Sequence, residues 1–141
     1  MKILKTVLVL CLWAPVAFAQ DAQQGEMAKE CEGSALDEIA AIKCYDAEYE
    51  LWDKWLNIAY DKALEQARKN DVRIDLAAGS RTATEAMTNM QRAWIDYRDA
   101  LCEGKSSGTP TSNAHAMAWS QCALYETARQ TKVLNGFAEG F

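Results

Sequence analysis

The spacing of apolar residues constrains the fold of this chain more than any other feature of the sequence. Apolar residues recur every three or four positions and almost never alternate with polar ones over a sustained stretch. This period places apolar side chains on one face of an α-helix, whereas a half-buried strand needs alternation. Three segments carry it: residues 35–69, residues 82–104, and a segment that starts near Ser112 or Asn113 and ends at Asn135-Gly136. The sequence predicts an all-α fold, a small bundle of three main helices in a single domain.

The first of these segments, residues 35–69, is long for a small domain. A continuous helix of that length spans about 50 Å, so we expect a bend or a break in it. Ser34 is a suitable N-cap, and Asp37 and Glu38 fall in the first turn, where the helix dipole favours acidic side chains. The predicted buried face of this helix consists of Tyr45, Tyr49, Trp52, Leu56, Ala59, Ala63 and Ala67.

The second and third helices are marked by boundary signals. Thr82 and Glu85 have the spacing of a capping box, and Gly104 is suited to end the second helix in a left-handed conformation. The apolar stripe of that helix consists of Ala83, Met87, Met90, Trp94, Tyr97 and Leu101. A loop follows over residues 105–110. His115 stands beside this loop, and we expect it to be exposed and without a partner.

The N-terminal residues have the pattern of a secretory signal peptide. Two lysines and a short apolar run precede an Ala-Phe-Ala sequence that ends at Ala19, where we expect cleavage. The run is shorter than the roughly 20 residues of a membrane span, so we expect no span after cleavage. A membrane anchor is one alternative. A lipoprotein signal at Cys11 is another, but Leu10 stands where a small residue is expected. Residues 20–141 would then form the exported domain, periplasmic or secreted from a bacterium.

Removal of residues 1–19 leaves an even number of cysteines, namely Cys31, Cys44, Cys102 and Cys122. An even number in an exported chain predicts disulfides, and the lack of a C-x-x-C spacing argues against a zinc site. Cys31 and Cys44 would lie about 20 Å apart on a straight helix, so a bridge between them needs a chain reversal near Gly33. Four cysteines allow three connectivities. We favour the two local pairs, Cys31–Cys44 and Cys102–Cys122, and leave the other pairings open.

Charge and composition exclude several function classes. Removal of residues 1–19 takes away two lysines and changes the formal net charge from −5 to −7, which argues against a nucleic-acid partner because phosphates require a basic face. The single histidine excludes sites that need two. The sequence also lacks a glycine-rich phosphate loop, a zinc signature and a nucleophile elbow. We therefore predict a binding protein that is not an enzyme and has no cofactor or metal.

Polar residues set among apolar ones form two groups on the predicted helices: Asp53, Asn57 and Tyr60 on the first, and Gln91, Arg98 and Asp99 on the second. Spacings of four and three residues place the first group on one helical face. Arg98 paired with Asp53 or Asp99 would hold the helices in register, and the amide and hydroxyl groups would complete a buried polar network. We expect a structural role for both groups, and a core position for Trp52, Trp55, Trp94 and Trp119.

The order of these residues resembles a known family. The pattern reads Cys31…Cys44…Asp53-x-x-Leu56-Asn57-x-x-Tyr60…Gln91-x-Ala93-Trp94-Ile95-x-Tyr97-Arg98-Asp99-Ala100-x-Cys102…Cys122. It is similar to the LprI-type lysozyme inhibitor family, secreted bacterial proteins long catalogued as a domain of unknown function. The resemblance covers residues 31–134, and residues 91–102 are its most specific part. It implies a small exported helical domain with disulfides that inhibits lysozyme.

The resemblance leads to two functional hypotheses. In the first, the acidic domain is attracted to a basic lysozyme and covers its cleft with the loop around Lys105, whose ammonium would meet a carboxylate of the cleft. In the second, the protein is a non-catalytic structural or stress protein of the envelope that binds another periplasmic partner. The sequence leaves the oligomeric state and the type of lysozyme open.

Overall fold

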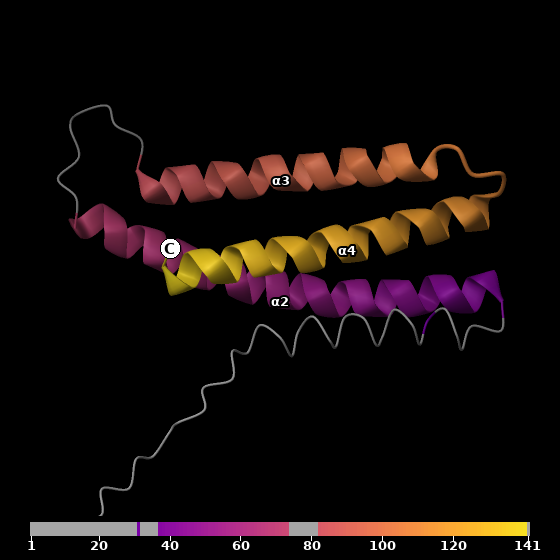
Figure 1. Cartoon of the computed structure of the whole chain (residues 1–141), viewed down its shortest axis with the longest axis horizontal. Helices are drawn as coiled ribbons and strands as arrows, with labels where there is room; N and C mark the ends of the chain where they lie inside the picture. Colours follow the sequence, from indigo (N-terminus) through magenta and orange to yellow (C-terminus); the bar gives the residue numbers. More distant parts are fainter. Residues whose placement is uncertain (1–30, 32–36, 74–81, 141) are drawn as a thin grey trace, which may run out of the picture.

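The described chain is a bundle of three α-helices. The computed structural model describes residue 31, residues 37–73 and residues 82–140. These residues form α2 (Glu38–Arg73), α3 (Ala83–Ser106) and α4 (Ser112–Glu139), and they include no strand. Successive helices run in opposite directions (Figure 1). The prediction of an all-α bundle with three main helices is therefore confirmed.

Helix α2 is continuous over its 36 residues, so the expected break is absent and the helix only curves (Figure 1). The physical reason is that α2 contains no glycine or proline that would interrupt it. The side chain of Asp37 caps α2, because its Oδ1 accepts a hydrogen bond from the backbone N–H of Ala40 at 2.8 Å. Ser34, the expected cap, lies outside the described residues, as do the predicted leader, Cys11 and the reversal near Gly33.

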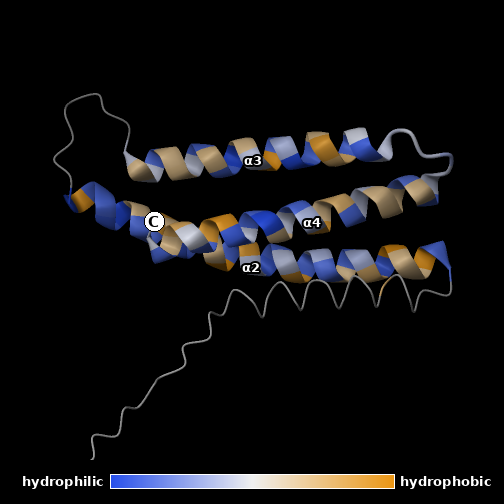
Figure 2. Ribbon diagram, viewed as in Figure 1, coloured by the Kyte–Doolittle hydropathy of each residue, from blue (hydrophilic) through white to orange (hydrophobic). Residues whose placement is uncertain are grey.

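The core lies mainly between α2 and α4. On α2 the buried apolar residues are Ala41, Tyr45, Trp52, Leu56, Ala59, Ala63 and Ala67, which confirms most of the predicted face. On α4 they are Cys122, Ala123, Leu124, Ala128 and Leu134. Trp52 is 1% exposed and meets the ring of Trp55 edge-on, with 4.8 Å between the ring centroids. Figure 2 shows hydrophilic and hydrophobic residues interleaved along every helix, as expected when one side of each helix is buried.

The start of α3 matches its sequence signal closely. The backbone N–H of Glu85 donates to Thr82 Oγ1 at 3.0 Å, and the backbone N–H of Thr82 donates to Glu85 Oε2 at 3.1 Å. The predicted capping box is thus confirmed. It satisfies two of the backbone donors that a helix start leaves without intrahelical partners.

Asp71, near the end of α2, adds a second cap to α3. Its Oδ1 accepts a hydrogen bond from the N–H of Ala83 at 2.6 Å. Its Oδ2 accepts from the N–H and the hydroxyl of Thr84, at 3.0 and 2.6 Å. The bond from the Thr84 hydroxyl, followed by the backbone bonds, holds the pKa of Asp71 below its ordinary value. One carboxylate therefore fixes the end of α2 against the start of α3.

The ends of α3 and α4 differ from the prediction. Helix α3 continues past Gly104 to Ser106, and α4 continues past Asn135-Gly136 to Glu139. The hydroxyl of Ser106 donates to the carbonyl oxygen of Cys102 at 2.9 Å. This bond satisfies a carbonyl group at the end of α3, so a glycine in the left-handed conformation is not needed there. Among the described residues the only glycine with a positive φ is Gly140, at 79°.

Two disulfides join the local cysteine pairs. Cys31 and Cys44 have Cα atoms 5.5 Å apart, and Cys102 and Cys122 have Cα atoms 5.4 Å apart. The favoured connectivity is therefore confirmed. Both bonds lie at the end of the bundle where α2 begins, α3 ends and α4 begins. No helix of the described ranges is long and apolar enough to cross a membrane.

Candidate functional site

Helices α2 and α3 enclose a surface groove of about 340 Å³. We call it the α2–α3 groove. From α2 it is lined by Tyr49, Asp53, Leu56, Asn57 and Tyr60, and from α3 by Thr88, Gln91, Arg92, Trp94, Ile95 and Arg98. Apart from the cysteines, eight of the twelve residues named in the sequence pattern line the groove, and the four that do not are Ala93, Tyr97, Asp99 and Ala100. The pattern that defines the resemblance thus marks one place on the surface.

Arg98 is the central charged residue of the groove, although it is only 8% exposed. Its Nε and one terminal nitrogen both donate to Asp99 Oδ1, at 2.8 and 2.7 Å. Its guanidinium carbon lies 5.1 Å from the ring centroid of Trp94 and 5.8 Å from that of Tyr49. The ion pair lies within α3 and does not itself link two helices. The contact with the Tyr49 ring of α2 makes that link instead, through the attraction of a cation to a π-face.

The other polar motif residues form two separate sets rather than one network. On α2, Asn57 Nδ2 donates to Asp53 Oδ2 at 3.3 Å. On α3, Gln91 is 8% exposed, and its Oε1 accepts a hydrogen bond from Gln130 Nε2 of α4 at 2.9 Å. Among the described residues no hydrogen bond joins Asn57 to Gln91, so the expected link between them is absent. Gln91 joins α3 to α4, and Asp53 and Asn57 stay at the wall of the groove.

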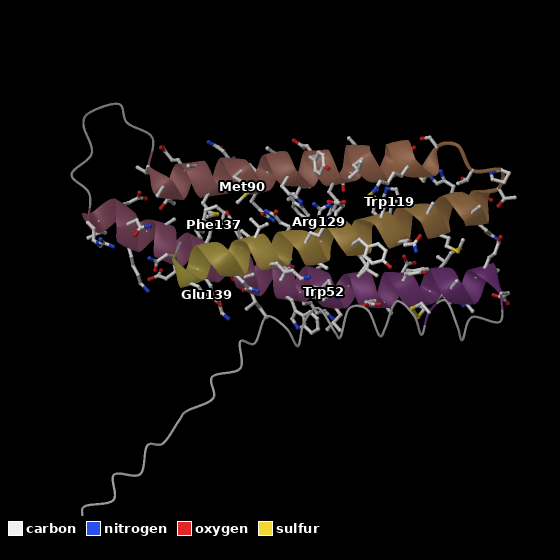
Figure 3. The ribbon with its side chains drawn as sticks, viewed as in Figure 1. Trp52, Met90, Trp119, Arg129, Phe137 and Glu139 are labelled. Atoms are coloured by element: carbon white, nitrogen blue, oxygen red, sulfur yellow. A yellow bond between two sulfur atoms is a disulfide. The ribbon has the colours of Figure 1, made fainter. Side chains whose placement is uncertain are left out.

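Tyr49 lines the groove from α2. Burial raises the pKa of its hydroxyl above the ordinary value, the Arg98 guanidinium opposes this rise, and the carboxylates of Asp53 and Asp99 add to it. The phenol therefore stays neutral at physiological pH. Its ring also meets that of Trp119 edge-on, with 6.3 Å between centroids. Trp119 belongs to α4 (Figure 3), so three helices meet at this position.

Tyr97 departs from its predicted position. It is 55% exposed and lies outside the buried face of α3, which consists of Met87, Gln91, Arg98, Cys102 and Ser106. Hydrophobicity alone selected Tyr97 over Gln91 and Arg98, which are polar yet buried. The buried face of α3 could have been predicted from Cys102, because a cysteine in a disulfide is expected inside. Going back along the helix from Cys102, steps of four, seven and four residues lead to positions 98, 91 and 87, which all lie on that face.

A second cavity, of about 320 Å³, lies at the end of the bundle away from the disulfides. It is lined by Ala63, Gln66, Ala67, Asn70, Ala83, Ala86, Met87, Met90 and Phe137. Figure 3 shows Met90 on α3 and Phe137 on α4 next to this space. Its lining is almost wholly apolar, in contrast to the charged α2–α3 groove.

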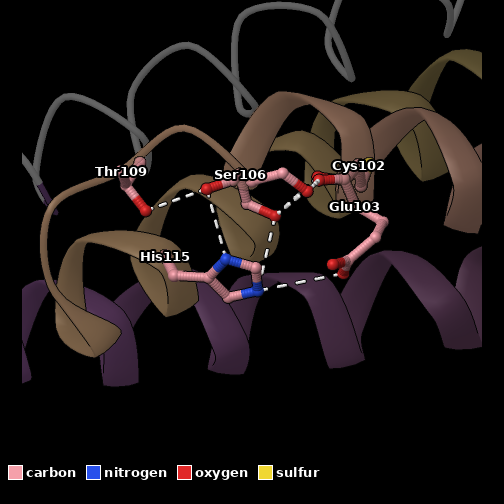
Figure 4. Close-up of polar contacts among 6 residues, drawn as sticks. Cys102, Glu103, Ser106, Thr109 and His115 are labelled. Carbon is pink, nitrogen blue, oxygen red and sulfur yellow. Dashed lines mark hydrogen bonds and ion pairs between the residues drawn. The ribbon is translucent and has the colours of Figure 1, made fainter.

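The loop between α3 and α4 is held by short-range polar contacts (Figure 4). The Thr109 hydroxyl donates to the Ser106 carbonyl oxygen at 2.8 Å, and His115 Nδ1 lies 3.2 Å from the same oxygen. Since a carbonyl oxygen only accepts, Nδ1 carries the proton. His115 Nε2 lies 3.8 Å from a carboxylate oxygen of Glu103. The expectation that His115 has no partner is therefore wrong. Lys105 is exposed in the last turn of α3, next to this loop.

The sequence of this chain matches the family described as Lysozyme inhibitor LprI over residues 19–134. The chain belongs to the LprI lysozyme inhibitor family. An uncharacterized protein of Rhizobium meliloti (strain 1021) is 31% identical over 133 residues, which cover 94% of this chain and 91% of that protein. No solved structure matches the chain.

The LprI match includes both disulfides, the α2–α3 groove and the loop between α3 and α4. The family is one of inhibitors rather than of catalysts. No group of three or more potential metal ligands occurs within the part of the chain that the structure describes.

Proposed function

We propose that this LprI-family protein is an exported inhibitor of lysozyme. The observation that carries the proposal is the family match over residues 19–134. Two disulfides support export, because such bonds persist mainly in oxidising compartments. In this proposal residues 1–19 are a cleaved leader and residues 20–141 are the working domain. The acidic net charge supports a basic protein as the partner, since opposite charges speed association.

The loop between α3 and α4, together with Lys105, is the surface that we propose covers the lysozyme cleft. The Cys102–Cys122 bond lies one turn before Ser106, and the contacts of Thr109 and His115 hold the segment that follows. A loop that is already ordered loses little conformational entropy on binding. Lys105 is exposed beside it and is available to a carboxylate of the cleft. Inhibition then requires only occupancy of the cleft.

The first test measures lysis of bacterial cell walls by chicken-type, goose-type and invertebrate-type lysozymes in the presence of oxidised residues 20–141. We expect dose-dependent inhibition of at least one type, weaker at high salt because the attraction between charged surfaces is screened. No inhibition of any type at micromolar protein would contradict the proposal. The protein would then be assigned to the second hypothesis, a non-catalytic envelope protein with another periplasmic partner.

The second test locates the inhibitory surface. Deletion of the loop is unsuitable, because Ser106 is fully buried and bonded to the end of α3. A Cβ at Gly108, by contrast, meets nothing within 4 Å, and Gly108 is exposed, so we expect Gly108→Trp to add a large group at the loop while the bundle stays folded. We expect Gly108→Trp to abolish inhibition and the matched variant Gly108→Ala to preserve it. Lys105→Gln should weaken inhibition, whereas Lys62→Gln, an exposed lysine of α2 far from this loop, should not. Full inhibition by both Gly108→Trp and Lys105→Gln would exclude the loop.

A further inference from the structure

The α2–α3 groove contains two charged side chains of opposite sign that form no ion pair with any described residue. Asp53 stands on the α2 wall, and its one hydrogen bond to a described residue is the 3.3 Å bond from Asn57. Arg92 stands on the α3 wall and forms neither a hydrogen bond nor an ion pair with any residue of the described ranges. The remaining charged residue of the groove, Arg98, already binds Asp99, which does not line the groove, at 2.7 Å. One carboxylate and one guanidinium are therefore left for a ligand.

The α2–α3 groove has the size of a small-molecule site. Its volume of about 340 Å³ lies at the lower end of the range that ligand pockets occupy. Asp53 and Arg92 come from opposite walls and do not form an ion pair with each other. The walls also carry the apolar side chains of Leu56, Trp94 and Ile95. The groove thus combines apolar surface with one carboxylate and one guanidinium that form no ion pair with a described residue.

We propose that the α2–α3 groove binds a short peptide that carries both a free ammonium and a free carboxylate. The ammonium would lie on Asp53 and the carboxylate on the guanidinium of Arg92, which is suited to hold a carboxylate through two hydrogen bonds. The amide of Asn57 and the hydroxyl of Thr88 would bond the peptide backbone between the ends. Small side chains would pack on Trp94 and Ile95. This site is separate from the loop that we assign to lysozyme.

Ligands of other charge types fit the groove less well. An anion such as a phosphate would pair with Arg92 but face the carboxylate of Asp53. A simple cation would pair with Asp53 but face Arg92. A neutral apolar ligand would leave both charged groups without a partner while it removed their water, which is costly. A ligand with both charges is the one that satisfies both walls.

The test uses the oxidised protein and the tripeptide Ala-Ala-Ala with free ends, titrated by calorimetry and by amide chemical shifts. We expect saturable shifts at groove residues. Acetylation of the peptide's amino end or amidation of its carboxyl end should each weaken binding about tenfold, which corresponds to about 1.4 kcal/mol. A tripeptide that ends in two D-alanines distinguishes the possible sources of the natural peptide ligand. Preference for it indicates a cell-wall peptide, and equal binding indicates an ordinary peptide terminus; either result supports the site.

Two variants assign the charges. Asp53→Asn should weaken binding of the free peptide about tenfold yet leave the acetylated peptide unaffected, because that peptide has no ammonium to lose. Arg92→Gln should likewise weaken binding of the free peptide about tenfold yet leave the amidated peptide unaffected, because that peptide has no carboxylate to lose. Asp96→Asn and Lys54→Gln change exposed charges of the same two helices outside the groove, and they should change nothing.

Three results would overturn the proposal: no saturable binding at millimolar peptide, equal affinity for capped and free peptides, or equal losses in the groove and control variants. Urea unfolding of each variant confirms that the fold is retained. Lysozyme inhibition is measured with the same proteins. We expect Asp53→Asn and Arg92→Gln to inhibit like the wild type, so failure of the peptide site and failure of lysozyme inhibition remain distinguishable.

Discussion

Removal of the Cys102–Cys122 bond by Cys102→Ala together with Cys122→Ala is expected to lower the free energy of unfolding by about 3 kcal/mol. The bond closes a loop with a sequence separation of 20. The loop-closure relation for the unfolded chain converts this length into about 3.3 kcal/mol at 25 °C. For Cys31–Cys44, with a separation of 13, the same relation gives about 2.9 kcal/mol. Chain entropy alone therefore predicts similar losses from the two bonds.

The burial of the Cys102–Cys122 bond increases the expected loss of stability. Cys102 is 0% and Cys122 is 6% exposed, and they pack with Ala123, Leu101 and Trp119. Replacing both sulfur atoms leaves a cavity, which adds to the loss because the surrounding helices relax only partly. The wild type with all four cysteines reduced retains most of that packing. The difference between the reduced wild type and the double variant measured under the same reducing conditions, in which neither protein has a cross-link, thus isolates the packing contribution.

The assay is urea unfolding of residues 20–141, followed by circular dichroism at 222 nm. The slope of the unfolding free energy against urea should rise in the double variant, since an unfolded chain without the cross-link exposes more surface. The Cys31→Ala with Cys44→Ala variant is the matched comparison. A loss below about 1 kcal/mol for the Cys102 and Cys122 variant, with an unchanged slope, would refute the argument from the unfolded chain.

Four further predictions concern single positions, all measured by urea or thermal unfolding. Thr82→Ala removes the capping box and should cost about 1 kcal/mol, and an equal stability would contradict the cap. The pKa of Asp71 is lowered in the folded state, so ionised Asp71 stabilises the fold fully above the pKa of an aspartate in the unfolded chain, about 3.9. This stabilisation is lost as the pH falls through the lower pKa of the folded state. Asp71→Asn should therefore make the free energy of unfolding depend less on pH in this acidic range. Gly104→Ala should stabilise α3 by about 0.5–1 kcal/mol, since a Cβ there meets nothing within 4 Å and φ is not positive, and a loss of stability would contradict this reasoning. Leu124→Ala, at a fully buried position, should cost about 2–5 kcal/mol, and a cost near zero would contradict its place in the core.

The helices and the α2 face were predictable from sequence because they follow from the spacing of apolar residues within one segment. The helix ends were less predictable, since they depend on single hydrogen bonds. Ser106 extends α3 beyond Gly104 by bonding to its own preceding turn, and Asp37 starts α2. Asp71 caps a helix twelve residues away, and no local pattern announces such a contact.

The location of the candidate site was predictable in part. The motif residues of two helices do converge on one groove, as shared helical faces suggested. Their partners were not predictable, because those depend on how α4 packs. Gln91 bonds to Gln130 of α4 rather than to α2, and Arg98 bonds to its own neighbour Asp99. Arg92, which has no partner among the residues that the structure describes, was not predicted as a site residue, since an exposed arginine on a helix carries no signal of its own.

The order of the disulfides has a consequence for how the protein matures. Each bond joins two cysteines that are consecutive among those of residues 20–141, and neither bond spans the other. If the chain is oxidised while it crosses a membrane, each cysteine meets its native partner before a later cysteine emerges. Pairing in order of appearance then yields the native connectivity directly, and no wrong bond has to be exchanged through mixed-disulfide intermediates. Maturation of this bundle should therefore depend on a disulfide oxidase but not on a disulfide isomerase.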